Sequence, residues 1–231
     1  MNEELETTKE IAKATQEVAK TVSRGLDVSR DMGKFVSKFI SGPIEEGMGI
    51  IEDKLKYIRW ERRQRLMSRA EEFMRDKGFS DPDSPVPLKN AVRFLEFATL
   101  EDNDSLQDLW AMLLVNGTNS TTGIKMERSF IEILGQLSPL EAKILEAVYS
   151  LPYEETRHNG VITENLPISA KVTNERSDKD TLEPDDEVKI ALSNLVRLGC
   201  LKFPMTWGGG EIFTSVNTTL IGKKLVAACT K

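Results

Sequence analysis

Apolar residues recur at helical spacing along the N-terminal part of the chain, residues 1–78. This spacing predicts an amphipathic helix over residues 3 to about 31 and a second long helix over residues 44 to about 77. Between them lies a compact apolar stripe from Met32 to Ile40, whose helix Gly42-Pro43 is expected to stop. Because neither long helix can bury its apolar face alone, we expect the two to pack as an antiparallel hairpin.

Shorter helices are predicted in a middle region, residues 86–136. They cover residues 88–100, about 104–117 and 127–136. The helix that starts near residue 104 is the least ambiguous, because its apolar residues are spaced i, i+3, i+4, i+7 and i+8. These residues are Leu106, Leu109, Trp110, Leu113 and Leu114. Either Asn103 or Asp104 is expected to cap this helix.

The remaining residues, 138–231, begin with a strong helix-start signal. Ser138-Pro139-Leu140-Glu141 is a capping box with proline at the first helical position, and its helix should run to about Ser150. Residues 152–183 are mostly polar and receive no assignment, except that 166–172 fits either a short helix or a strand. A helix over residues 184–198 follows.

A hairpin and a closing helix complete the C-terminal part. Strands are predicted at Leu201–Trp207 and Ile212–Val216, on either side of the turn Gly208-Gly209-Gly210, and the closing helix covers Thr218–Cys229. This order is that of a winged-helix domain. The predicted fold is therefore mainly α, with an N-terminal long-helix hairpin and helical region followed by a C-terminal winged-helix-like α+β domain.

The net negative charge of the chain disfavours nucleic acid as a partner. The formal net charge is −6 and the isoelectric point is about 5.1, which argues against a general nucleic-acid binder. Cys200 and Cys229 both lie among apolar residues, which predicts buried free thiols in a reducing cytosol.

The acidic N-terminus is unlike a signal peptide, and no apolar run is long enough for a transmembrane helix. A cytoplasmic protein is expected.

Catalytic chemistry is not indicated by any residue pattern. His158 is the only histidine, and together with the two cysteines it supplies fewer ligands than a structural zinc site needs. Glu101 to Asp104 is better explained as a loop and helix cap than as a cation site. No enzyme activity, catalytic residue, cofactor or metal is therefore predicted.

Two N-terminal segments are candidates for binding. A basic cluster suited to an anionic partner is interspersed with glutamates, so a solvated helix with internal ion pairs explains it better than a binding site does. Its residues are Lys54, Lys56, Arg59, Arg62, Arg63 and Arg65. The stripe before Gly42 is typical of amphipathic helices at a membrane surface, here the inner membrane, and also of a buried hairpin. Its residues are Lys34, Phe35, Val36, Lys38, Phe39 and Ile40.

The winged-helix order makes DNA a third candidate partner. The helix that would enter the major groove starts in Glu183-Pro184-Asp185-Asp186-Glu187, and these carboxylates would repel phosphate. Lys189, Arg197 and Lys202 are the residues that would contact DNA. A protein-contact role is therefore favoured for the winged-helix-like domain. A DNA-binding transcriptional regulator is the alternative function.

Several stretches give the chain a resemblance to a family of bacterial proteins. They are Ile11–Lys20, Gly42–Glu46 with Asp53–Trp60, Leu106–Leu114 and Phe130–Leu145. In this order they resemble the abortive-infection alpha family. The resemblance implies defence against phage by halting or killing the infected cell, and it supplies no established catalytic residues. We therefore predict a non-enzymatic anti-phage protein that acts through a protein partner or self-association, with the membrane surface as a further candidate contact and nucleic acid disfavoured.

Overall fold

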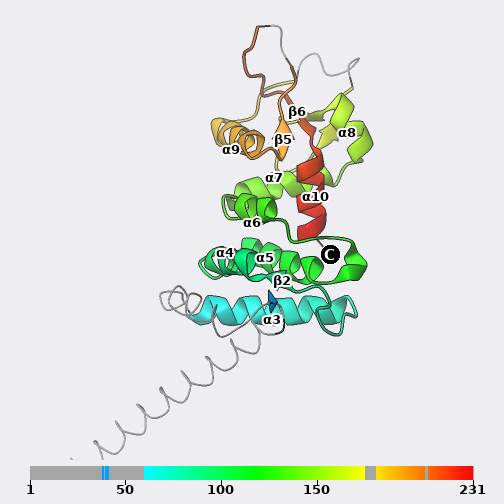
Figure 1. Cartoon of the computed structure of the whole chain (residues 1–231). Coiled ribbons are helices and arrows are strands. Elements are labelled where there is room, and N and C mark those ends of the chain that lie inside the picture. Colours follow the sequence, from blue (N-terminus) through cyan, green and yellow to red (C-terminus); the bar gives the residue numbers. More distant parts are fainter. Residues whose placement is uncertain (1–37, 39, 42–59, 175–180, 206–207, 231) are drawn as a thin grey trace, which may run out of the picture.

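The structure is a computed structural model that describes residues 38, 40–41, 60–174, 181–205 and 208–230. It is mainly helical with a small antiparallel sheet, and its elements form successive layers (Figure 1). Helix α3 lies at one end, followed by the layer of α4 and α5, then α6 and α7, and the sheet with α8 and α9 lies at the other end. Helix α10 runs from the sheet towards α5.

The first layers consist of helices with short connections. They are α3 (Trp60–Asp76), α4 (Leu88–Ala98), α5 (Asp104–Gly117), the 3₁₀ helix η1 (Ser120–Thr122) and α6 (Arg128–Leu134). The helices predicted over 88–100, 104–117 and 127–136 are confirmed. Of the two candidate caps, Asn103 caps α5, because its side chain accepts a hydrogen bond from the backbone N–H of Leu106.

Most of the predicted N-terminal hairpin falls outside the described residues, and α3 corresponds to the last part of its predicted second helix. Strand β1 (Ile40–Ser41) pairs in parallel with β2 (Val86–Pro87). The prediction that one helix would continue through Ile40 to Gly42 is therefore wrong at Ile40. The main chain at Ile40 and Ser41 pairs with the segment before α4, and it cannot belong to a helix at the same time.

The C-terminal part contains α7 (Pro139–Tyr149), α8 (Tyr153–Asn159), α9 (Asp186–Arg197) and α10 (Leu220–Cys229). The capping box at the start of α7 is confirmed. The predicted starts of the last two helices are each two residues early, for one physical reason. Asp185 and Thr219 act as caps, accepting hydrogen bonds from the N–H groups of Val188 and Gly222, so helical bonding begins only after them.

The sheet has the order β4-β3-β6-β5, and every pair in it is antiparallel. Its strands are β3 (Val161–Ile162), β4 (Lys171–Val172), β5 (Leu201–Lys202) and β6 (Ser215–Thr218). The predicted hairpin exists, but its strands pair only at the base, and Pro204 has no N–H to extend the first of them. The polar stretch that received no assignment supplies α8, β3 and β4, and its part at 166–172 ends in a strand.

The buried residues form one hydrophobic cluster from Leu66 on α3 to Cys229 on α10. Trp110 of α5 lies at its centre, fully buried, with Phe94 packed edge-on at 5.4 Å between ring centroids and Phe97 stacked at 6.0 Å. The C-terminal end of α10 joins this core through Asn116, whose side-chain amide donates to the carbonyl oxygens of Ala228 and Thr230 at 3.0 Å each. The division into residues 86–136 and 138–231 and the winged-helix name both stay predictions.

Candidate functional site

Arginines of α3 face carboxylates of α5 along the edge of the contact between these helices. Arg69 makes a bidentate pair with Asp108, with Nε–Oδ1 at 2.9 Å and Nη2–Oδ2 at 2.8 Å. Arg65 Nη1 lies 2.7 Å from Oδ1 of the same carboxylate. Asp104 receives a hydrogen bond from Arg62, which lowers the pKa of this carboxyl group.

The predicted basic cluster is thus partly engaged within the protein. Arg62 and Arg65 form ion pairs with α5, whereas Arg63 has no ion pair with any described residue, and burial lowers its pKa. Lys54, Lys56 and Arg59 lie outside the described residues. An anionic partner for this cluster stays a prediction.

The candidate DNA contacts on α9 and β5 do not form one basic surface. Lys189 Nζ lies 3.1 Å from Glu183 and 3.4 Å from Asp186, and the bond with Lys189 lowers the pKa of Glu183. Arg197 donates to Asn194 at 2.9 Å and to Gln136 at 3.0 Å. Only Lys202, exposed on β5, has no side-chain partner among the described residues. The acidic start of α9 also has a structural role, since carboxylates stabilise the positive end of a helix dipole.

The candidate membrane stripe falls almost entirely outside the described residues, which include neither Lys34, Phe35, Val36 nor Phe39. Lys38 forms an ion pair with Asp81 at 3.2 Å, and Ile40 belongs to β1. Within the described ranges, no helix has the length and apolar character to cross a membrane.

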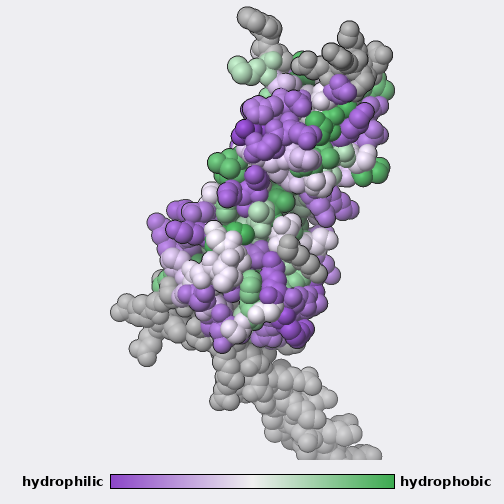
Figure 2. Space-filling model, turned by 90° about the vertical axis from the view of Figure 1, so that its right-hand side faces the viewer, coloured by the Kyte–Doolittle hydropathy of each residue, from purple (hydrophilic) through white to green (hydrophobic). Residues whose placement is uncertain are grey.

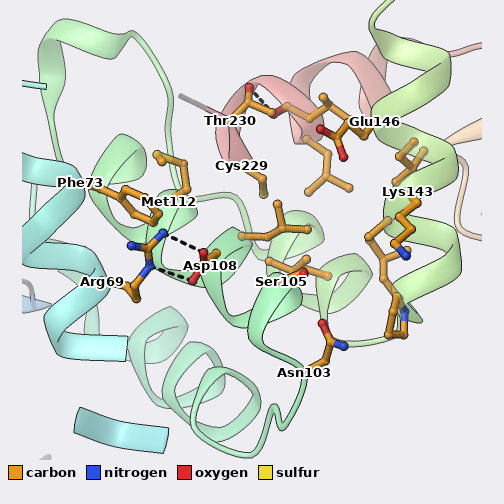
Figure 3. Close-up of a pocket in the computed structure, with 18 residues that line it drawn as sticks. Arg69, Phe73, Asn103, Ser105, Asp108, Met112, Lys143, Glu146, Cys229 and Thr230 are labelled. Carbon is orange, nitrogen blue, oxygen red and sulfur yellow. Dashed lines mark hydrogen bonds and ion pairs between the residues drawn. The ribbon is translucent and has the colours of Figure 1, made fainter. Parts of the chain in front are cut away.

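A cavity of about 670 Å³ lies between α3, α5, α7 and α10 (Figure 3). Apolar residues from each of these helices contribute to its wall, together with residues around the end of α6. Among them is Cys229, whose free thiol is buried, and burial raises its pKa to about 12. Cys200 is likewise a buried free thiol, so the predicted state of both cysteines is confirmed.

Polar groups occupy separate positions around the cavity (Figure 3). Arg69 and Asp108 line one side, already bonded to each other. Lys143 lies across the cavity from them, Asn103 and Ser105 lie between these two sides, and Glu146 lies nearer to Thr230. Sequence reasoning missed this cavity, because its walls come from segments far apart in the chain and no local motif marks them.

A second surface lies at one end of the sheet, where the β3–β4, β5–β6 and β4–α9 connections meet. The backbone N–H of Thr163 bonds to the carbonyl of Thr214 at 3.2 Å, and that of Phe213 bonds to the carboxylate of Glu183 at 3.4 Å. These connections carry large exposed apolar side chains, which we call the apolar loop end: Ile168, Leu182, Met205 and Ile212. Figure 2 shows several separate hydrophobic areas among hydrophilic ones on the upper part of the molecule.

Comparison with known proteins identifies the family. A family model described as abortive infection alpha matches residues 61–229, which contain the cavity, α9 and the apolar loop end. No curated protein and no solved structure matches the chain. Because the matched segment covers well over half of the sequence, the chain belongs to the abortive infection alpha family.

Proposed function

We propose that this protein defends bacteria against phage by abortive infection, without enzymatic activity of its own, by binding a protein partner through the apolar loop end. The observation that carries the defence role is the family match over residues 61–229. The observation that carries the partner role is the exposure of Ile168, Leu182 and Met205 on connections that meet at one end of the sheet. A contiguous exposed apolar patch is a usual surface for binding other proteins, and our proposal is that these side chains form one.

Protein contact is favoured over DNA contact by the charges around this end. Glu183 and Glu211 lie on the same connections as the apolar residues, and α9 begins with Asp186 and Glu187. Phosphate contacts require unpaired basic groups, whereas Lys189 is already paired with carboxylates. A partner with apolar and basic residues complements this surface better than a nucleic acid does.

The proposal is tested by phage challenge of bacteria that express the chain. The wild type should reduce plaque formation while infected cells die or stop growing. The double variant Ile168→Glu/Met205→Glu should lose most of this protection at unchanged protein level and unchanged thermal stability, because it places charge on the apolar loop end. Leu100→Glu is the matched control. Leu100 is also a large exposed apolar side chain, but it lies after α4, away from the apolar loop end. Its variant should therefore still protect the cells.

Other outcomes count against parts of the proposal. Full protection by the double variant would exclude the apolar loop end as the partner surface. If cells that express the wild-type protein are not protected against any phage tested, the defence role itself is wrong. Salt-sensitive binding of the purified protein to DNA, lost in Lys202→Ala, would support a regulator instead.

A further inference from the structure

The cavity in Figure 3 has the size and the lining of a small-molecule site. Its volume of about 670 Å³ lies within the range of about 300–1,000 Å³ that is usual for ligand pockets. Leu109 and Met112 of α5, Leu145 of α7 and Leu225 of α10 supply apolar wall on different sides. We propose that this cavity binds a small amphipathic molecule with an apolar body and an anionic group.

The charges around the cavity decide where the anionic group lies. Of the charged residues that line it, Arg69 and Asp108 neutralise each other through two hydrogen bonds. Lys143 and Glu146, one turn apart on α7, form no ion pair with any described residue. Lys143 is therefore the cation that an anionic ligand can use.

Neighbouring groups strengthen the preference for an anion beside Lys143. Asn103 and Ser105, near the start of α5, line the part of the wall between Asp108 and Lys143 (Figure 3). The side-chain oxygen of Asn103 already accepts the N–H of Leu106, so the group that Asn103 offers to a ligand is its amide N–H. The Ser105 hydroxyl adds a second neutral donor. A carboxylate, sulfonate or phosphate group held by Lys143 would then face an amide and a hydroxyl on the adjoining part of the wall.

Glu146 adds a second requirement for the ligand. Its carboxylate lines the cavity nearer to Cys229 and Thr230, away from Asn103 (Figure 3). A carboxylate accepts hydrogen bonds and repels a second anion. The ligand therefore carries a single anionic group at the Lys143 side, and an N–H or O–H donor on its apolar body satisfies Glu146.

Occupation of the cavity would act on the packing of the whole molecule. The cavity wall is formed by α3 and α5 together with α7 and α10, so a bound molecule would contact all four of these helices at once. A ligand that binds only the folded protein raises its stability by mass action. Binding should therefore raise the unfolding temperature as well as produce a spectroscopic signal.

A matched pair of fluorescent probes tests the proposal on the full chain. The probes are 1-anilinonaphthalene-8-sulfonate and N-phenyl-1-naphthylamine, which share their rings and amine and differ in the sulfonate. Both should bind saturably, with one site per chain. Lys143→Gln should weaken the sulfonate probe roughly fivefold, as expected for one partly exposed ion pair, and leave the neutral probe unchanged. The control Lys202→Gln, an exposed lysine on β5, should change neither.

Filling the cavity provides the second arm. Ser105→Trp places a large ring at the exposed rim, and Ala142→Phe places one on the α7 wall, so each should weaken both probes at least roughly tenfold. The rim variant keeps the test valid if the wall variant does not fold.

Unchanged binding in both variants, or binding lost in Ile168→Glu instead, would show that the probes bind elsewhere and overturn the site. An equal effect of Lys143→Gln on both probes would overturn the anionic preference. None of these outcomes depends on phage defence.

Discussion

Helix α3 is held on α5 by charge pairs along the edge of an apolar contact, whereas α10 is held against α7 and β5 by close approach around a single tyrosine. In the first contact, Asp108 accepts hydrogen bonds from Arg69 and lies within 2.7 Å of Arg65. In the second, the Tyr149 hydroxyl donates to the carbonyl oxygen of Cys200 and accepts from the N–H of Thr219 at 3.0 Å.

The difference predicts how each contact responds to change. Charged side chains at a partly exposed edge can rearrange around a new neighbour, but their attraction is screened by salt and depends on ionisation. The junction around Tyr149 has no space to rearrange, because an added Cβ on Gly222 of α10 would overlap both the Tyr149 hydroxyl and the Cys200 carbonyl. The α3–α5 contact should therefore be sensitive to the solvent, and the α7–α10–β5 junction to volume and to deprotonation.

Gly222→Ala should have the largest effect. The methyl group would separate α10 from Tyr149 and weaken its hydrogen bonds, at a cost of about 3 kcal/mol in the free energy of unfolding, well above what alanine gains in a helix. Urea unfolding measures the loss. The matched control is Gly208→Ala, since a Cβ on Gly208 meets no atom within 4 Å and its variant should stay within about 0.5 kcal/mol of the wild type. Equal stability of the two variants would refute the close junction.

Alkaline pH should weaken the same junction and also the C-terminal end of α10, where Cys229 lies. Burial raises the pKa of Tyr149 from 10.0 to about 12 and those of Cys200 and Cys229 from 9.0 to about 12. A raised pKa means that these groups stabilise the fold fully below about pH 9 and lose this contribution as the pH rises towards 12. Each buried thiol should contribute about 1.4 kcal/mol per pH unit to the decline.

The variant Cys229→Ala isolates one of these groups. Urea unfolding between about pH 9 and pH 11, under reducing conditions, should show a shallower decline in stability for the variant than for the wild type. The α3–α5 arginines stay charged throughout this range, so they add nothing to the slope. An identical slope in both proteins would mean that the Cys229 thiol is not desolvated in the fold.

Local signals in the sequence were sufficient for most of the described helices, although α8 was not predicted. The apolar spacing of Leu106 to Leu114 and the capping box at Ser138 both act within one or two helical turns, so α5 and α7 were predictable without any knowledge of the fold. Strand β3 was not predicted, and β4 was predicted only as an alternative to a short helix, because two residues are too few to show an alternating pattern and no turn signal like Gly208-Gly209-Gly210 marks them. Their pairing with each other and with β6 is determined by the tertiary structure.

Long-range contacts explain why the candidate site was missed. The basic cluster was visible in the sequence, but the carboxylate that pairs with Arg62 of this cluster lies 42 residues away on another helix. The cavity depends on the same kind of placement, since Lys143 and Asn103 come together only after α5 and α7 have packed. A pattern of side chains along one helix carries no information on which distant residue will lie opposite it.

Asp108→Asn should give the smallest effect and the strongest dependence on salt. The substitution keeps the size of the side chain but leaves Arg65 and Arg69 without their shared charge, which should lower the free energy of unfolding by about 1 kcal/mol at low ionic strength. In about 1 M salt, screening should reduce this loss to a small fraction, whereas the loss in Gly222→Ala should persist. Glu164→Gln is the control, because Glu164 is exposed and has no ion pair with a described residue. If Asp108→Asn lowers the free energy of unfolding equally at both salt concentrations, charge attraction does not hold α3 on α5. The α3–α5 contact would then depend on packing, as the α7–α10–β5 junction does.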